Sequence, residues 1–114
     1  MKLSEFEKIV LKALVERDSE KEIILSQLRE ATVLERDYTG VGLFTKIQIS
    51  ENSPLLSNSN RYLEEAPKAH LEHPQLEAGA GVILWFEEGK ISTLECYTYD
   101  GSWPKNESLF TISA

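Results

Sequence analysis

The sequence predicts an α+β fold, with an N-terminal helical hairpin packed on one face of a mainly antiparallel sheet of about five strands. Two observations carry this prediction. Apolar residues in the first 31 positions recur at the three-to-four-residue spacing of a helix. From residue 32 onward the pattern changes to alternation with period two, interrupted by glycine-containing turns. A length of 114 residues fits one domain. We therefore expect a single domain over 1–114, with the helical hairpin at 1–31 and a β-rich part at 32–114.

Two helices are predicted in the first part. Ser4 and Glu7 have the spacing of a capping box, in which each side chain satisfies the other residue's backbone N–H. An apolar stripe follows, and it predicts a helix over about residues 5–17. The stripe consists of Phe6, Ile9, Val10, Ala13 and Leu14. Residues 18–22 supply further capping signals, and a second helical face then continues from Ile23 to Ala31.

Alternating residues predict a first β-hairpin, with strands at 32–38 and 43–50 around a turn at 39–42. In its second strand Leu43, Thr45, Ile47 and Ile49 share one face. Residues 51–60 read as a loop, and we expect a short strand at about 61–65. Two prolines, Pro67 and Pro74, interrupt the following stretch. The last strand is expected over residues 109–113, at an edge of the sheet.

A second hairpin is predicted around Glu88-Gly89, because glycine accepts the positive φ of a tight type I′ turn. With Phe86 opposite Ile91, simple pairing sets Leu84 across from Thr93 and Val82 across from Glu95. Both faces of this hairpin are then substantially apolar. Such a sheet must be covered on both sides, or it leaves one face partly open as a contact surface.

Glu95 lies inside this apolar and aromatic strand, and alternation places Tyr97 and Tyr99 on its face. A buried carboxylate must be paired or hydrogen-bonded. One interpretation is structural: Glu95 accepts a hydrogen bond from a tyrosine hydroxyl, a backbone amide or an arginine such as Arg36 or Arg61. The other is functional: Glu95 forms the floor of an aromatic-rimmed groove for a cationic side chain, with cation-π contacts from Tyr97, Tyr99 or Trp103.

No motif for catalysis, a metal or a cofactor is apparent. His70 and His73 have the H-x-x-H spacing of two metal ligands on a helix, but they lack a third ligand and precede Pro74. The glycine pairs 40/42 and 79/81 precede strands, without the loop and helix of a phosphate site. Their expected role is steric, because glycine tolerates tight turns and allows a close approach of another backbone or a ligand. We therefore assign no catalytic residue, metal ligand or cofactor.

The net charge of −7 is unevenly distributed, with nine acidic and eight basic residues in 1–50 against ten acidic and four basic in 51–114. This field repels nucleic acid and anionic membranes and favours a basic protein partner. Cys96 is the only cysteine, so we expect a buried thiol and no internal disulfide. Together with the absence of an apolar leader, this predicts a cytoplasmic protein.

Three segments resemble a group of small, mostly uncharacterised bacterial proteins: residues 38–45 (YTGVGLFT), 79–81 (GAG) and 94–104 (LECYTYDGSWP). That group shows a G-x-G-aromatic-x-T hairpin followed by an L-E-G-Y/F-T-Y-x-x-x-W-P block. Here Leu43 replaces a frequent aromatic residue and Cys96 the usual glycine. The resemblance implies an α+β fold and a bacterial origin, without an activity. In size, acidity and lack of catalytic motifs, the chain is also similar to immunity proteins, small domains that cover the active site of a basic nuclease toxin.

The leading hypothesis is a non-enzymatic, acidic binding protein that neutralises a basic toxin partner in an immunity role. Its expected binding residues are Glu95, Tyr97, Tyr99, Trp103, Glu87 and Glu88. The alternative is a small enzyme or small-ligand sensor that uses Glu95 with His70 or His73 in a pocket beside the sheet. A third hypothesis is a homodimer that pairs through an exposed face or edge of the sheet.

Overall fold

The computed structural model of the chain describes residues 1–58, 61 and 65–113. Within this part, two helices precede six strands, and a short 3-10 helix precedes the last strand. They are α1 (Glu5–Val15), α2 (Lys21–Leu28), β1 (Thr32–Tyr38), β2 (Gly42–Gln48), β3 (Lys68–His73), β4 (Leu76–Glu87), β5 (Lys90–Thr98), η2 (Glu107–Leu109) and β6 (Thr111–Ser113). The strands form one sheet in the order β1-β2-β5-β4-β3-β6, and every neighbouring pair is antiparallel. The α+β class is confirmed, with six strands where about five were predicted.

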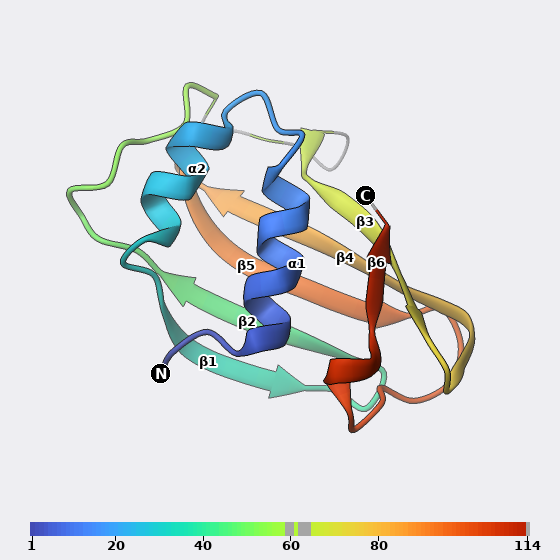
Figure 1. Cartoon of the computed structure of the whole chain (residues 1–114). Coiled ribbons are helices and arrows are strands. Elements are labelled where there is room, and N and C mark those ends of the chain that lie inside the picture. The colour runs from blue at the N-terminus through green and yellow to red at the C-terminus, as the bar shows by residue number, and fades with distance from the viewer. Residues whose placement is uncertain (59–60, 62–64, 114) are drawn as a thin grey trace.

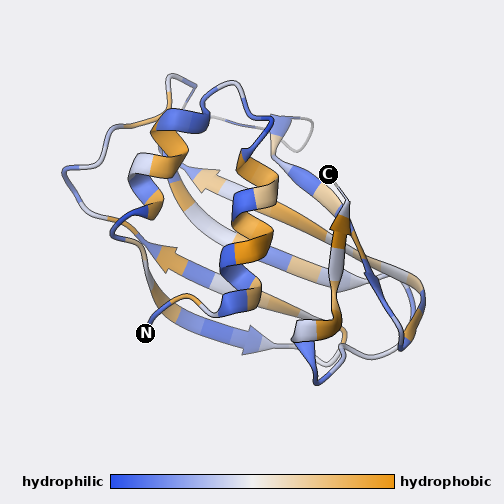
Figure 2. Cartoon of the chain, in the orientation of Figure 1, coloured by the Kyte–Doolittle hydropathy of each residue, from blue (hydrophilic) through white to orange (hydrophobic). Residues whose placement is uncertain are grey.

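Both helices lie on the same side of the sheet, and α1 crosses its central strands (Figure 1). The capping box is present as predicted: Ser4 Oγ accepts from the Glu7 backbone N–H, and Glu7 accepts from that of Ser4. The predicted stripe faces the sheet through Phe6, Val10 and Leu14, whereas Ile9 is exposed. Figure 2 shows this amphipathic pattern along α1. None of the described helices is long and apolar enough to cross a membrane.

One buried amide ties α2 to the sheet. The Gln27 side chain is fully buried, and its Nε2 donates to the carbonyl oxygens of Pro54 (2.8 Å) and Gly89 (2.9 Å). Its Oε1 accepts from the backbone N–H of Ile91 at 2.9 Å. Gln27 therefore holds together the short helix, the loop after β2 and the β4–β5 turn.

The first hairpin and the last edge strand are confirmed, as strands β1, β2 and β6. Strand β3 was not predicted. Its two flanking prolines mark its limits, because Pro67 precedes the strand and Pro74 lies in the turn to β4, where no ladder N–H is needed. The short strand expected at about 61–65 falls largely on 62–64, outside the described residues, while Arg61 and Glu65 lie in no strand.

The predicted register of the second hairpin is wrong beyond its first pair. Glu88 and Gly89 form the turn with φ of 51° and 79°, and Phe86 pairs with Ile91 as expected. Trp85 then pairs with Thr93, so Ser92 is an extra residue, a β-bulge. The one-residue shift pairs Leu84 with Leu94, and both side chains are completely buried. Glu95 therefore pairs with Ile83 and points away from the helices.

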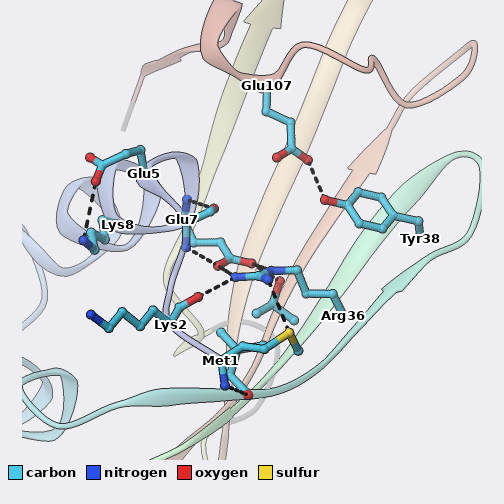
Figure 3. Close-up of polar contacts among 11 residues, drawn as sticks. Met1, Lys2, Glu5, Glu7, Lys8, Arg36, Tyr38 and Glu107 are labelled. Carbon is cyan, nitrogen blue, oxygen red and sulfur yellow. Dashed lines mark hydrogen bonds and ion pairs between the residues drawn. The ribbon is translucent and has the colours of Figure 1, made fainter.

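A buried ion pair joins α1 to the edge of the sheet (Figure 3). Glu7 is completely buried, and Arg36 of β1 donates to both of its carboxylate oxygens at 2.8 Å. Thr45 Oγ1 of β2 donates to Glu7 at 2.7 Å, and Arg36 also donates to the carbonyl of Lys2. Burial raises the pKa of Glu7, but the bonds from Arg36, Ser4 and Thr45 and the arginine charge outweigh it, so this pKa lies below its ordinary value.

We predict that Glu7→Gln lowers the free energy of unfolding by about 3 kcal/mol, because it leaves Arg36 without its buried partner. The lowered pKa means that the stabilisation is present above the ordinary value of 4.5 and is lost as pH falls through the folded-state pKa. Urea unfolding followed by circular dichroism from pH 7 to pH 3 measures both effects. The wild type is expected to lose stability more steeply at acid pH than the variant.

Glu5→Gln is the matched control, because Glu5 belongs to the same helical turn but its side chain is 87% exposed. It should leave stability almost unchanged. Equal effects of the two substitutions, or parallel pH profiles for wild type and Glu7→Gln, would contradict the structural role of this ion pair.

Candidate functional site

The face of the sheet turned away from the helices carries most of the aromatic residues of the central strands. Directly paired residues point to the same side of a sheet, so the pairings place side chains in rows. One row runs through Phe44, Glu95 and Ile83, and the next through Tyr97, Gly81 and His70. Trp85 lies on the same side, two residues from Ile83. We call this surface, made of Phe44, His70, Ile83, Trp85, Glu95, Tyr97 and Tyr99, the open face.

Glu95 lies at the centre of the open face, and its partner differs from those considered from the sequence. Trp85 Nε1 donates to Glu95 Oε1 at 2.9 Å. The two arginines bind other carboxylates: Arg36 contacts Glu7, and Arg61 contacts Asp18 at 2.7 Å and Glu20 at 3.3 Å. The carboxylate is therefore held in position by a neutral indole, which leaves its negative charge without an opposite charge in direct contact among the described residues.

Ile83 shows how densely the side chains of the open face pack. Neither α1 nor α2 covers this side of the sheet, and yet Ile83 is only 7% exposed. Its cross-strand partners are Glu95 and Lys68, and Trp85 and Gly81 flank it along β4. The larger side chains around it therefore close over it and form a continuous surface above the strands.

Two glycines of β4 allow aromatic rings to lie across the sheet. A Cβ at Gly81 would be 2.5 Å from Cζ of Tyr97, and one at Gly79 would be 2.7 Å from Cε1 of His70. Tyr97 also contacts Tyr99 edge to face, and Tyr99 stacks on His70 with ring centroids 5.7 Å apart. The predicted steric role of this glycine pair is confirmed. At Gly79 the nearest atom is the backbone oxygen of Leu71, 2.5 Å from such a Cβ, as expected for a backbone neighbour. The Tyr97 and His70 rings are side chains of the open face, which the sequence analysis did not consider.

The structure places Glu95, Tyr97 and Tyr99 together on the open face and Trp103 on the other side of the sheet. Trp103 packs on Phe6 and Phe110, on the helix side of the sheet. Glu87 and Glu88 lie at the β4–β5 turn, beside a cavity of about 610 Å³ that Lys46 and Lys90 also line. Alternation along β4 places Glu87 on the same side of the sheet as Trp85, at the end of the strand, and Glu88 lies in the turn.

The histidines of the alternative hypothesis belong to two different clusters. Both lie on strand β3, where a helix had been considered. His70 Nε2 is 2.7 Å from Glu72 Oε1, whereas His73 Nε2 is 2.9 Å from the carbonyl of Asn106 and its ring meets Phe110. Glu95 contacts neither of them through a hydrogen bond found in the described part of the chain. That part also holds no group of three or more metal-ligating residues.

Sequence analysis missed Phe44, Trp85, Ile83 and His70 as members of this surface. Phe44 was detectable, because it alternates with the inward-facing Leu43 and Thr45. Trp85 and Ile83 were assigned to the face opposite Glu95 because the bulge at Ser92 was not foreseen. Cys96 faces the core, where burial raises the pKa of its thiol, so it is unsuited to act as a nucleophile.

We predict that Gly81→Ala lowers the free energy of unfolding by about 1–3 kcal/mol, because the added methyl group displaces the Tyr97 ring. The Tyr97→Ala substitution in the same chain removes that clash. The loss from Gly81→Ala should therefore be much smaller in the Tyr97→Ala background than in the wild type. Chemical unfolding of the four proteins of this double-mutant cycle measures the coupling. Additive losses would show that the ring does not lie across Gly81.

Comparison with known proteins identified no relative of this chain. No protein-family model matches it, and neither a curated protein nor a solved structure does. What the open face can bind is therefore inferred from its own side chains.

Proposed function

We propose that the protein is a non-enzymatic binding protein whose open face docks onto a basic protein partner. The observation that supports this most directly is a sheet face that α1 and α2 leave uncovered and that carries packed aromatic rings near a carboxylate held by an indole. Aromatic residues contribute disproportionately to protein interfaces. A negative charge among them selects a partner that presents lysine or arginine.

Exposure on the open face is concentrated in residues suited to binding. Phe44 is 37% exposed and Tyr99 is 52% exposed, whereas Ile83 of the same face is buried. The rings are fixed by packing, so little side-chain entropy is lost when a partner covers them. The carboxylate of Glu95 is already oriented by Trp85 and can accept a partner's cation without rearrangement.

The charge of the chain supports a basic partner. The net charge is −7, and residues 51–114, which include β4 and β5, carry most of it. Such a field accelerates encounter with a basic protein and weakens as salt is added. Within this proposal the partner is a basic toxin, and the protein blocks it in an immunity role by covering its functional surface.

We predict that Phe44→Ala and Tyr99→Ala each weaken capture of the partner by at least about tenfold, because both remove exposed aromatic anchors. The tagged wild type and its variants are used as bait in extracts of the native cell, and captured proteins are quantified by mass spectrometry. Ile9→Ala is the matched control, since Ile9 is a large hydrophobic residue, 59% exposed, on the helix side. Equal capture by all variants contradicts the proposal.

Glu95→Gln distinguishes a basic partner from a second copy of this chain. It removes the charge and keeps the shape, so binding of a basic partner should weaken and lose part of its salt dependence. A homodimer through the open face would place two copies of Glu95 in one interface and should not weaken on this substitution. Sedimentation velocity of both proteins reports the mass directly, and a dimeric wild type that Phe44→Ala dissociates would overturn the proposal in favour of self-association.

A further inference from the structure

A second aromatic and acidic site lies away from the open face, beside the turn between β1 and β2. A cavity of about 280 Å³ is lined there by Tyr38, Gly40, Trp103, Pro104, Lys105 and Glu107. Tyr38 ends β1, and Glu107 begins the short helix η2, so residues far apart in sequence form its walls. Figure 3 shows the Tyr38 hydroxyl and the Glu107 carboxylate pointing toward one another.

Two neutral aromatic donors hold the carboxylate of Glu107. Trp103 Nε1 donates to Glu107 Oε2 at 2.8 Å, and the Tyr38 hydroxyl donates to the same oxygen at 3.4 Å. The other oxygen, Oε1, accepts none of the hydrogen bonds identified within residues 1–58, 61 and 65–113. The site therefore contains a positioned carboxylate oxygen that is free to accept a bond from a ligand.

No cation of the chain neutralises Glu107 by direct contact in the described residues. Arg36 interacts electrostatically with Glu107 at longer range, but its guanidinium is bound to both carboxylate oxygens of Glu7 and to the Lys2 carbonyl. Burial raises the pKa of the Tyr38 phenol, and the negative charge of Glu107 raises it further. The Glu107 carboxylate therefore gives this cavity a negative group that can attract a positive charge, with Lys105 on the same wall opposing it.

The cavity is rigid on its tryptophan side. The Trp103 ring lies 4.9 Å from Phe110 and 6.0 Å from Phe6, measured between centroids. The Trp103 backbone N–H also donates to the carbonyl of Gly40 at 2.9 Å. A tryptophan fixed from behind in this way can present its π face or edge to a ligand with little loss of entropy.

We propose that the Tyr38–Trp103–Glu107 cavity binds the side-chain cation of a lysine or arginine presented by another molecule. The carboxylate supplies the opposite charge, and the two aromatic side chains supply cation-π contacts. The volume lies just below the range of ordinary small-molecule pockets and suits one side chain better than a larger ligand. Lys105 on the wall of the cavity makes no ion pair in the described residues and acts as an internal competitor.

Nuclear magnetic resonance of the ¹⁵N-labelled chain tests this binding, because the Trp103 indole N–H directly contacts Glu107. The probes are N-acetyl-lysine methylamide, N-acetyl-arginine methylamide and tetramethylammonium, and the neutral control is N-acetyl-norleucine methylamide. The lysine or arginine derivative should shift the Trp103 indole resonance saturably, with a Kd on the order of 1–10 mM. The Trp85 indole resonance reports separately on any binding of the probes at Glu95 of the open face.

Substitutions assign the binding energy to particular groups. Glu107→Gln should weaken binding of the cationic probes at least about tenfold. Tyr38→Ala should also weaken their binding, and it tests the proposal independently if Glu107→Gln does not fold. Lys105→Met should strengthen binding about two- to threefold, since it removes the competing charge. Thermal unfolding verifies that each variant is folded.

Three results would overturn the proposal. One is an equal shift caused by the norleucine derivative, and another is undiminished binding to both Glu107→Gln and Tyr38→Ala. The third is tighter binding of tetramethylammonium than of either amino-acid derivative, which would assign the cavity to a small quaternary ammonium ligand. None of these results bears on the open face, because that surface is monitored separately through Trp85.

Discussion

The β-bulge at Ser92 determines which side chains of β5 face the helices and which face the other side of the sheet. One extra residue between Ile91 and Thr93 shifts the pairing of β5 with β4 by one position. Because side chains alternate along a strand, this shift turns Leu94 and Cys96 into the core and Glu95 and Tyr97 outward. Without it, the carboxylate would lie across from Val82, under the helices. A single unpaired residue thus sets which side chains of β5 join the apolar core and which lie on the face that carries Glu95 and the aromatic rings.

Four carboxylates of the described residues show two different ways in which a partner can hold them. Glu7 and Asp18 are bound by Arg36 and Arg61, and these ion pairs attach α1 and the segment after it to the sheet and the loop. Glu95 and Glu107 are instead each held by the indole N–H of a tryptophan, at 2.9 Å and 2.8 Å. An arginine both orients a carboxylate and neutralises its negative charge. An indole N–H orients a carboxylate but, being neutral, does not neutralise that charge. The arginine-bound pairs therefore suit a structural role, and the tryptophan-bound pairs suit recognition of a cation.

The local features of the fold could be predicted from the sequence, because they depend on neighbours in the chain. The capping box at Ser4, the stripe of α1, the first hairpin and the positive φ at Glu88 and Gly89 follow from spacing and residue type. Strand β3 was missed since its prolines were read as interruptions rather than as limits. Glu7 was recognised as a capping residue, but its bond to Arg36 joins positions 29 residues apart and has no signature in the spacing.

By itself, then, the sequence determined the α+β class, the order of the two N-terminal helices and the first hairpin, and the membership of Glu95 and Tyr97 in one face of a strand, with Tyr99 just beyond its end. Only the tertiary structure decided which side of the sheet that face occupies, that Trp85 orients Glu95, and that Trp103 lies apart with Glu107. The physical reason is that period and propensity act over a few residues. Register and long-range hydrogen bonds are instead set by the packing of the whole core, where a shift of one residue reverses every side chain of a strand.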